Sequence, residues 1–172
     1  MGGSDIQLFE YYLLPGYIFL NREPSLISTV LGSSVAVSLW DRKKKYGGIA
    51  NYLYPFTKIR EQATAQYGNV AVRHLVKMLL EEGAKAKDIE AQIFGGAETA
   101  SPECAKVARG NVNVARKALK ALKIKVISED VGGGLGRKVV FDTLKNEALV
   151  YKVDTLRGSD WYPYLYEGDR GR

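Results

Sequence analysis

The residue types that do acid–base or nucleophilic chemistry are scarce in this chain. The single histidine, His74, falls between the apolar residues Val72 and Leu75, which is typical of a half-exposed helix position. The single cysteine, Cys104, follows Ser-Pro-Glu in a predicted loop with no histidine nearby, so it indicates an incidental thiol. No Cys/His cluster and no phosphate-binding glycine loop occurs, and we expect neither a metal nor a cofactor.

Two polar residues, Ser34 and Asn51, lie on segments that predict one β-hairpin. Residues 34–40 alternate between apolar and small side chains, and residues 49–54 alternate again, which is the pattern of half-buried strands. The intervening residues 42–48 contain four basic residues and two glycines, which favours a long turn. An antiparallel hairpin of this kind lets Ser34 and Asn51 approach each other.

The rest of the chain predicts alternating strands and helices. Apolar residues at i, i+3, i+4 and i+7 predict an amphipathic helix over 69–82 that Gly83 stops, and Asn111 is placed to cap a second helix. The glycine-rich residues 132–136 predict a loop. Further strands are predicted at 89–94, 125–128, 138–141 and 148–153.

Length and composition indicate one globular domain over residues 1–172, with a core of about 12–153 and an extended tail at 158–172. The chain has 172 residues, of which 46% are hydrophobic, and no run approaches the ~20 apolar residues of a membrane span. Its start resembles no secretory signal. We therefore expect a cytoplasmic protein without direct membrane insertion.

The net charge of +6 raises nucleic acid as a partner of a different class. The charge is diffuse, however, and its densest run, residues 42–45, lies in the predicted hairpin turn, where solvated basic residues are common. No nucleic-acid motif is present. A basic nucleic-acid-binding module remains only a remote alternative, and we expect no nucleic-acid partner.

Five segments occur in a characteristic order along the chain: L-L-P-G-Y (13–17), S-T-V-L-G-S-S-V-A-V-S-L-W-D (28–41), G-G-I-A-N-Y-L-Y-P (47–55), F-G-G-A (94–97) and E-D-V-G-G-G-L-G-R (129–137). Together they resemble the chemoreceptor glutamine deamidase family, CheD, over about 12–153. The resemblance implies an α/β (α+β) fold, a three-layer sandwich with a mixed β core and two main helices. It also implies hydrolysis of glutamine side-chain amides on the helices of methyl-accepting chemotaxis receptors, and a CheC-type phosphatase as a second partner.

The same resemblance locates the family's catalytic positions. The family's nucleophile is a Cys in L-G-S-C-V-A-V and its base is a His in G-G-x-x-H-x-x-x-P, and here these positions hold Ser34 and Asn51. A Thr or Ser shortly before the nucleophile completes the family's site, and Ser28 or Thr29 fills that place.

Three carboxylates are possible substitute bases: Glu98, Glu129 and Asp130. The last two occupy the family's E-D-x-G-G positions, which indicates a role in loop architecture.

Serine at position 34 and asparagine at position 51, in place of the family's Cys and His, argue against catalysis. A cysteine thiol has a reference pKa of about 8.5 and ionises beside an imidazolium, whereas a serine hydroxyl needs a base, and Asn51 cannot hold a proton at neutral pH. We expect little or no deamidation, and a pseudoenzyme that acts by binding. Two alternatives stay open: an active amidohydrolase that uses Ser34 with another base, or a chain whose active site was deliberately changed.

Overall fold

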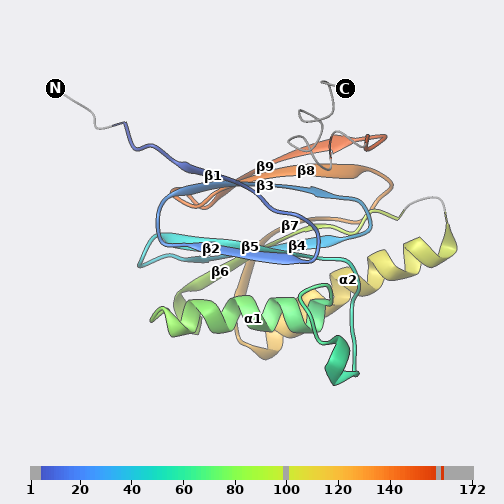
Figure 1. Cartoon of the computed structure of the whole chain (residues 1–172), viewed down its shortest axis with the longest axis horizontal. Helices are drawn as coiled ribbons and strands as arrows, with labels where there is room; N and C mark the ends of the chain where they lie inside the picture. The colour runs from blue at the N-terminus through green and yellow to red at the C-terminus, as the bar shows by residue number, and fades with distance from the viewer. Residues whose placement is uncertain (1–4, 99–100, 158–159, 161–172) are drawn as a thin grey trace, which may run out of the picture.

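The structure is a computed structural model that describes residues 5–98, 101–157 and 160. Its elements form three layers: a four-stranded sheet, a five-stranded sheet in the middle, and two helices that cover the far face of the middle sheet (Figure 1). The strand order is β1-β3-β8-β9 in the outer sheet and β2-β5-β4-β6-β7 in the middle sheet, and each sheet contains one parallel pair. The predicted three-layer α+β sandwich with a mixed β core and two main helices is confirmed.

The strands and helices have the following bounds. The strands are β1 (Phe9–Tyr12), β2 (Tyr17–Asn21), β3 (Ser25–Leu31), β4 (Val35–Asp41), β5 (Tyr46–Tyr52), β6 (Ile89–Gly95), β7 (Lys125–Val131), β8 (Gly136–Asp142) and β9 (Glu147–Val153). The helices are α1 (Gly68–Glu81) and α2 (Pro102–Ala121), with short 3-10 turns η1 (Arg60–Gln62) and η2 (Ala86–Asp88).

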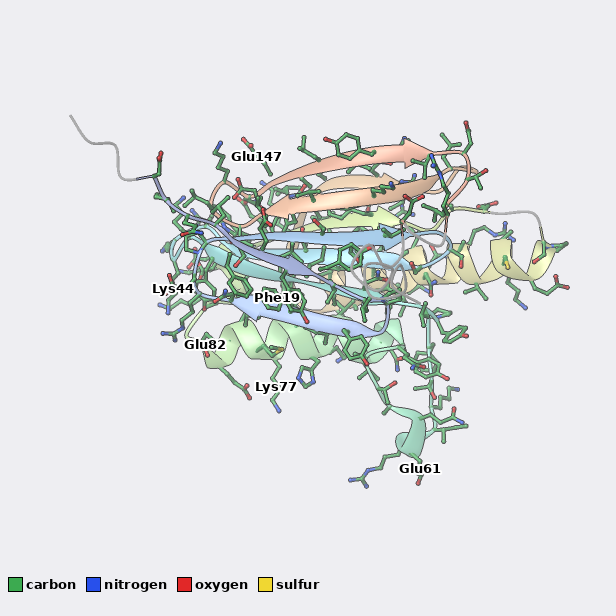
Figure 2. The ribbon with its side chains drawn as sticks, turned by 45° about the horizontal axis from the view of Figure 1, so that its top comes forward. Phe19, Lys44, Glu61, Lys77, Glu82 and Glu147 are labelled. Atoms are coloured by element: carbon green, nitrogen blue, oxygen red, sulfur yellow. The ribbon has the colours of Figure 1, made fainter. Side chains whose placement is uncertain are left out.

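The helices bury an apolar stripe against the middle sheet. In α1 the predicted periodic residues are all buried, and the helix stops at Gly83, whose φ of +91° suits glycine. Figure 2 shows Lys77 on the opposite, solvent-facing side of α1. The α1 residues that are both predicted and buried are Val72, Leu75, Val76 and Leu79.

The second helix begins earlier than the sequence predicted. Pro102 occupies its first turn, and the Ser101 side chain caps it by accepting the Cys104 N–H at 3.1 Å. Asn111 therefore lies inside α2 and is buried, so its predicted capping role is wrong. Cys104 is exposed in the first turn of the helix, not in a loop.

The hairpin between β4 and β5 is confirmed, but its two glycines lie in the strand. A Cβ on Gly47 would approach Leu39 O to 2.2 Å, and one on Gly48 would approach Phe19 O to the same distance. Because β5 runs between β2 and β4, these positions exclude side chains. The turn is confined to residues 42–45 and ends at Lys45, with φ of +60°.

Other parts of the fold were not predicted. Strands β1, β2 and β3 had no predicted counterpart, and β7 continues beyond residue 128 to Val131. The predicted tail at 158–172 lies outside the described residues except for Asp160, which accepts a bond from Lys138 Nζ at 2.6 Å. Among the described residues no helix combines the length and apolar character that crossing a membrane requires.

Candidate functional site

Three polar side chains meet between the two sheets, at the end where β3 leads into β4. Thr29 belongs to β3 of the outer sheet, Asn51 belongs to β5 of the middle sheet, and Ser34 directly precedes β4. Their exposed fractions are 1%, 0% and 3% respectively. The predicted positions 34 and 51 therefore lie in the interior of the sandwich, not on its surface.

Asn51 is held by the outer sheet. Its Nδ2 donates to Thr29 Oγ1 at 2.8 Å and to the Val30 carbonyl at 3.3 Å. Thr29 Oγ1 in turn donates to the Leu13 carbonyl at 2.8 Å, so the hydroxyl is fixed as acceptor for the amide. Asn51 Oδ1 makes no hydrogen bond to any described residue. Both hydrogens of the amide are directed at the outer sheet, and its oxygen is left unpaired.

Ser34 lies close to Asn51 but is not bonded to it. The register places Ala36 opposite Asn51, which makes Ser34 the diagonal neighbour of Asn51 on the same face. Diagonal neighbours in antiparallel strands are about 7–8 Å apart, a distance that two short side chains do not close. The Ser34 carbonyl accepts the Gly96 N–H at 2.8 Å, while Ser34 Oγ is buried without a partner among the described residues.

The structure separates the two candidates for the third site residue. In the β3–β8 register Thr29 pairs with Val139, which belongs to the core between the sheets. Ser28 pairs with Val140 and lines a small pocket on the other face of the outer sheet, together with Tyr12. Thr29 contacts Asn51, and Ser28 lies on the opposite side of the strand.

Asn111 supports the site and was not recognised as doing so from the sequence. Its Nδ2 donates to the carbonyls of Ser33 at 2.9 Å and Leu53 at 3.0 Å, which tie together the segments just before Ser34 and just after β5. Its position among the buried residues Ala108 and Ala115, at helical spacing, is the sequence signal that identifies an inward-facing residue.

Tyr52 reinforces this arrangement on the helix side of the middle sheet. Its hydroxyl donates to the Asn111 carbonyl, and burial raises the pKa of Tyr52 above its ordinary value. The phenol therefore remains a neutral hydrogen-bond donor at physiological pH.

A buried arginine organises the glycine-rich loop near the site. Arg137 is 2% exposed, and its guanidinium contacts Asp130 Oδ1 at 3.0 Å and the carbonyls of Leu135 and Gly132 at 3.1 and 2.9 Å. Gly132 N–H donates to the Gly95 carbonyl, which links the loop to the end of β6. The interpretation of Asp130 as loop architecture agrees with these contacts.

The remaining candidate bases are engaged elsewhere. Glu129 forms a bidentate pair with Arg116, whose hydrogen bonds lower the pKa of the Glu129 carboxyl. Glu98 pairs with Arg109 at 3.0 Å. His74 is exposed on α1, on the helix layer. Within the described residues no three His, Cys, Asp or Glu side chains gather as metal ligands.

Comparison with known proteins shows the family to which this chain belongs. A family model described as "CheD chemotactic sensory transduction" matches residues 55–152, which is more than half of the chain. The chain belongs to the CheD family, and the resemblance noted from the sequence is confirmed.

Individual relatives extend the match over most of the chain. "Probable chemoreceptor glutamine deamidase CheD" of Trichlorobacter lovleyi is 35% identical over 151 residues, covering 86% of this chain and 92% of that protein. "Probable chemoreceptor glutamine deamidase CheD 1" of Anaeromyxobacter dehalogenans is 39% identical over 154 residues, covering 88% of each. "Probable chemoreceptor glutamine deamidase CheD" of Sulfurimonas denitrificans is 33% identical over 148 residues, covering 83% of this chain and 93% of that protein.

Proposed function

We propose that this chain is a chemotaxis protein that binds chemoreceptor helices through the CheD scaffold and deamidates their glutamines little or not at all. The observation that supports the proposal most directly is the hydrogen bonding of the Asn51 side-chain amide. Both hydrogens of its amide are directed at the outer sheet, and its oxygen cannot act as a base at neutral pH. The position that should activate a nucleophile holds a group that only stabilises the sandwich.

The nucleophile position supports the same proposal. Deamidation of a carboxamide requires attack on a poor electrophile, followed by proton transfer to the departing ammonia. Ser34 Oγ has no hydrogen bond to a base among the described residues, and Glu98 and Glu129 are paired with arginines. A serine hydroxyl without a base is a weak nucleophile.

The partners and location of the chain belong to the same proposal. The names of the relatives specify a chemoreceptor as substrate, and a chain that keeps the scaffold keeps a surface for receptor helices. A CheC-type phosphatase is the second partner that we propose, on the basis of the sequence resemblance alone. We also propose a single domain over residues 1–172 and a cytoplasmic location, on the basis of length and composition.

The test measures binding and chemistry on one substrate. The chain is titrated into a purified chemoreceptor cytoplasmic fragment by isothermal titration calorimetry, and the same mixtures are analysed by peptide mass spectrometry for conversion of glutamine to glutamate. We expect saturable binding and no conversion above that of the fragment alone. A parallel titration with a CheC-type phosphatase tests the second partner.

Two outcomes would overturn the proposal in different ways. Absence of binding to the receptor fragment would remove the binding function. Conversion that Ser34→Ala abolishes would show an active hydrolase that uses Ser34, and the base would then be identified by substituting Glu98 and Glu129 in turn.

A further inference from the structure

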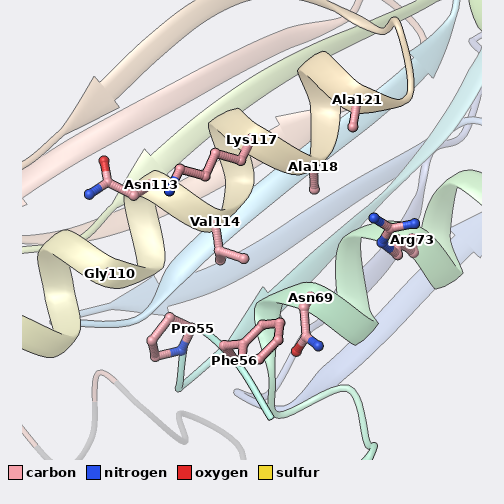
Figure 3. Close-up of a pocket in the computed structure, with 10 residues that line it drawn as sticks. All are labelled: Pro55, Phe56, Asn69, Arg73, Gly110, Asn113, Val114, Lys117, Ala118 and Ala121. Carbon is pink, nitrogen blue, oxygen red and sulfur yellow. The ribbon is translucent and has the colours of Figure 1, made fainter. Parts of the chain in front are cut away.

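An open groove of about 590 Å³ runs between the two helices, away from the inter-sheet site. Figure 3 shows α1 and α2 as its walls and the segment after β5 closing one end. The floor is apolar, and Phe56 at the closed end is 52% exposed. The residues that form the floor and the closed end are Pro55, Phe56, Val114, Ala118 and Ala121.

Each wall of this groove carries one positively charged side chain. Arg73 projects from α1 and Lys117 from α2, and both side chains are exposed (Figure 3). Among the described residues, none that lines the groove is acidic. Neither cation has an acidic neighbour three or four residues away on its own helix, and neither forms an ion pair or hydrogen bond within the described part of the chain.

Other arginines of α2 differ from this pair. Arg109 is bonded to Glu98 at 3.0 Å and Arg116 to Glu129 at 2.7 Å, so their charges are already compensated within the fold. The two groove cations retain their full capacity to attract an anion. Uncompensated charge beside exposed apolar surface is complementary to a ligand that is both acidic and apolar.

The closed end of the groove is held in place without using the cations. Asn69 Oδ1 accepts the Thr57 N–H at 3.1 Å, and Asn69 Nδ2 donates to the Thr57 carbonyl at 3.0 Å. This pair fixes the segment that carries Phe56 against the start of α1. A preformed wall lowers the ordering cost of binding.

We propose that the groove between α1 and α2 binds an acidic amphipathic helix of a protein partner. Apolar residues at i, i+3 and i+4 of that helix pack on Val114, Ala121 and Phe56, as in other helix-in-groove complexes. Flanking carboxylates pair with Arg73 on one wall and Lys117 on the other. This inference requires no deamidase activity and does not depend on the proposed function.

The test uses a fluorescein-labelled synthetic helical peptide with a Leu stripe and flanking Glu residues. Its binding to the full chain is followed by fluorescence anisotropy at low and physiological ionic strength. We expect Arg73→Glu combined with Lys117→Glu to weaken binding about tenfold or more, since two attractive contacts become repulsive. Phe56→Ala should weaken it about fivefold through loss of apolar contact.

A matched control separates local from global charge. Lys87→Glu combined with Lys145→Glu changes the net charge by the same amount at exposed positions on other elements, the η2 turn and the turn between β8 and β9. This control should leave affinity within about twofold, as expected when distant exposed charges are screened. A second peptide with Lys in place of each Glu should not bind.

Three results would overturn the proposal. These are absence of binding by the acidic peptide, equal weakening by both charge-reversal pairs, and tighter binding of duplex DNA or anionic vesicles through the same two cations. A nuclear magnetic resonance titration of the unmodified chain with the acidic peptide tests the site even if a substituted variant does not fold. We expect shifted amide signals over 69–73 and 110–121, and shifts confined to other residues would contradict the proposed site.

Discussion

The two faces of the middle sheet differ in what they bury. The face toward the helices buries apolar side chains such as Val35, Val37 and Leu39, which pack on α1 and α2. The face toward the outer sheet mixes apolar residues such as Ala36 and Trp40 with several buried polar ones. The polar residues of this interface include Ser34, Ser38, Asn51, Gln92 and, from the outer sheet, Thr29.

Apolar packing explains the helix-facing side of the middle sheet better than the side that faces the outer sheet. Apolar burial accounts for most of the helix-facing layer, where Asn111 is a buried polar exception, because each apolar side chain contributes about 1.5–3 kcal/mol when it leaves water. The same argument does not explain Ser34 Oγ and Asn51 Oδ1, which are buried without partners among the described residues and each cost free energy. These two buried polar atoms therefore need an explanation other than apolar packing.

The largest effect is expected on the helix-facing side. Leu75→Ala should lower the free energy of unfolding by about 2–5 kcal/mol, because it removes a fully buried side chain and leaves a cavity. Chemical denaturation measures the change. Leu80→Ala on the same helix, where the side chain is 43% exposed, is the matched control and should cost much less. Equal losses would contradict the packing assigned to α1.

An intermediate effect is expected at Thr29. Thr29→Val keeps the shape of the side chain but deprives Asn51 Nδ2 of its closer acceptor and the Leu13 carbonyl of its donor. The free energy of unfolding should fall by about 1–3 kcal/mol. Thr29→Ser keeps the hydroxyl and should recover most of that loss. If both variants lose the same stability, the hydroxyl does not hold Asn51.

A smaller, pH-dependent effect is expected from Glu129. Arg116 lowers the pKa of the folded carboxyl, so the pair stabilises the protein above the unfolded pKa of about 4.3, and this contribution disappears as pH falls through the lowered folded value. The carboxylate is 30% exposed, so we expect less than about 1 kcal/mol. Thermal unfolding of Glu129→Gln should differ from the parent near neutral pH and converge with it in acid. Divergence toward acid would have the wrong sign.

The smallest effect is expected at Ser34. Ser34→Ala removes a buried hydroxyl that has no partner among the described residues, so stability should change by less than about 0.5 kcal/mol or increase slightly. Differential scanning calorimetry resolves this change. A loss above about 1 kcal/mol would show that the hydroxyl contributes a hydrogen bond to the fold, and would remove the contrast between the two faces.

The sequence predicted those elements whose apolar residues follow one period. The α1 stripe identified the helix because it buries one continuous face. The alternation around Val35 and Ile49 identified the central hairpin, although β4 and β5 are buried on both faces of the middle sheet. Strand β3 was not predicted. Its inward positions include Ser25 and Thr29, which break the apolar alternation because their hydroxyls donate hydrogen bonds to the carbonyls of Glu23 and Leu13.

Site geometry was less accessible from the sequence. The pairing of β4 with β5 brought Ser34 and Asn51 to one face, as predicted. The family resemblance offered Ser28 or Thr29 as the third residue, but the sequence did not show which of the two contacts Asn51 from the other sheet. Asn111 was interpreted as a helix cap because Asn is common there, whereas in the fold it bonds to two distant carbonyls. Contacts between elements remote in sequence decided both positions.

The most direct test of the account restores a thiol and an imidazole. Ser34→Cys combined with Asn51→His is compared with the parent chain and with Ser34→Cys alone, on the same chemoreceptor fragment, by peptide mass spectrometry. Thermal unfolding first establishes that each variant is folded. We predict conversion of glutamine to glutamate by the double variant only. Conversion by the parent chain at a similar rate would contradict the claim that Ser34 and Asn51 form an inactive site.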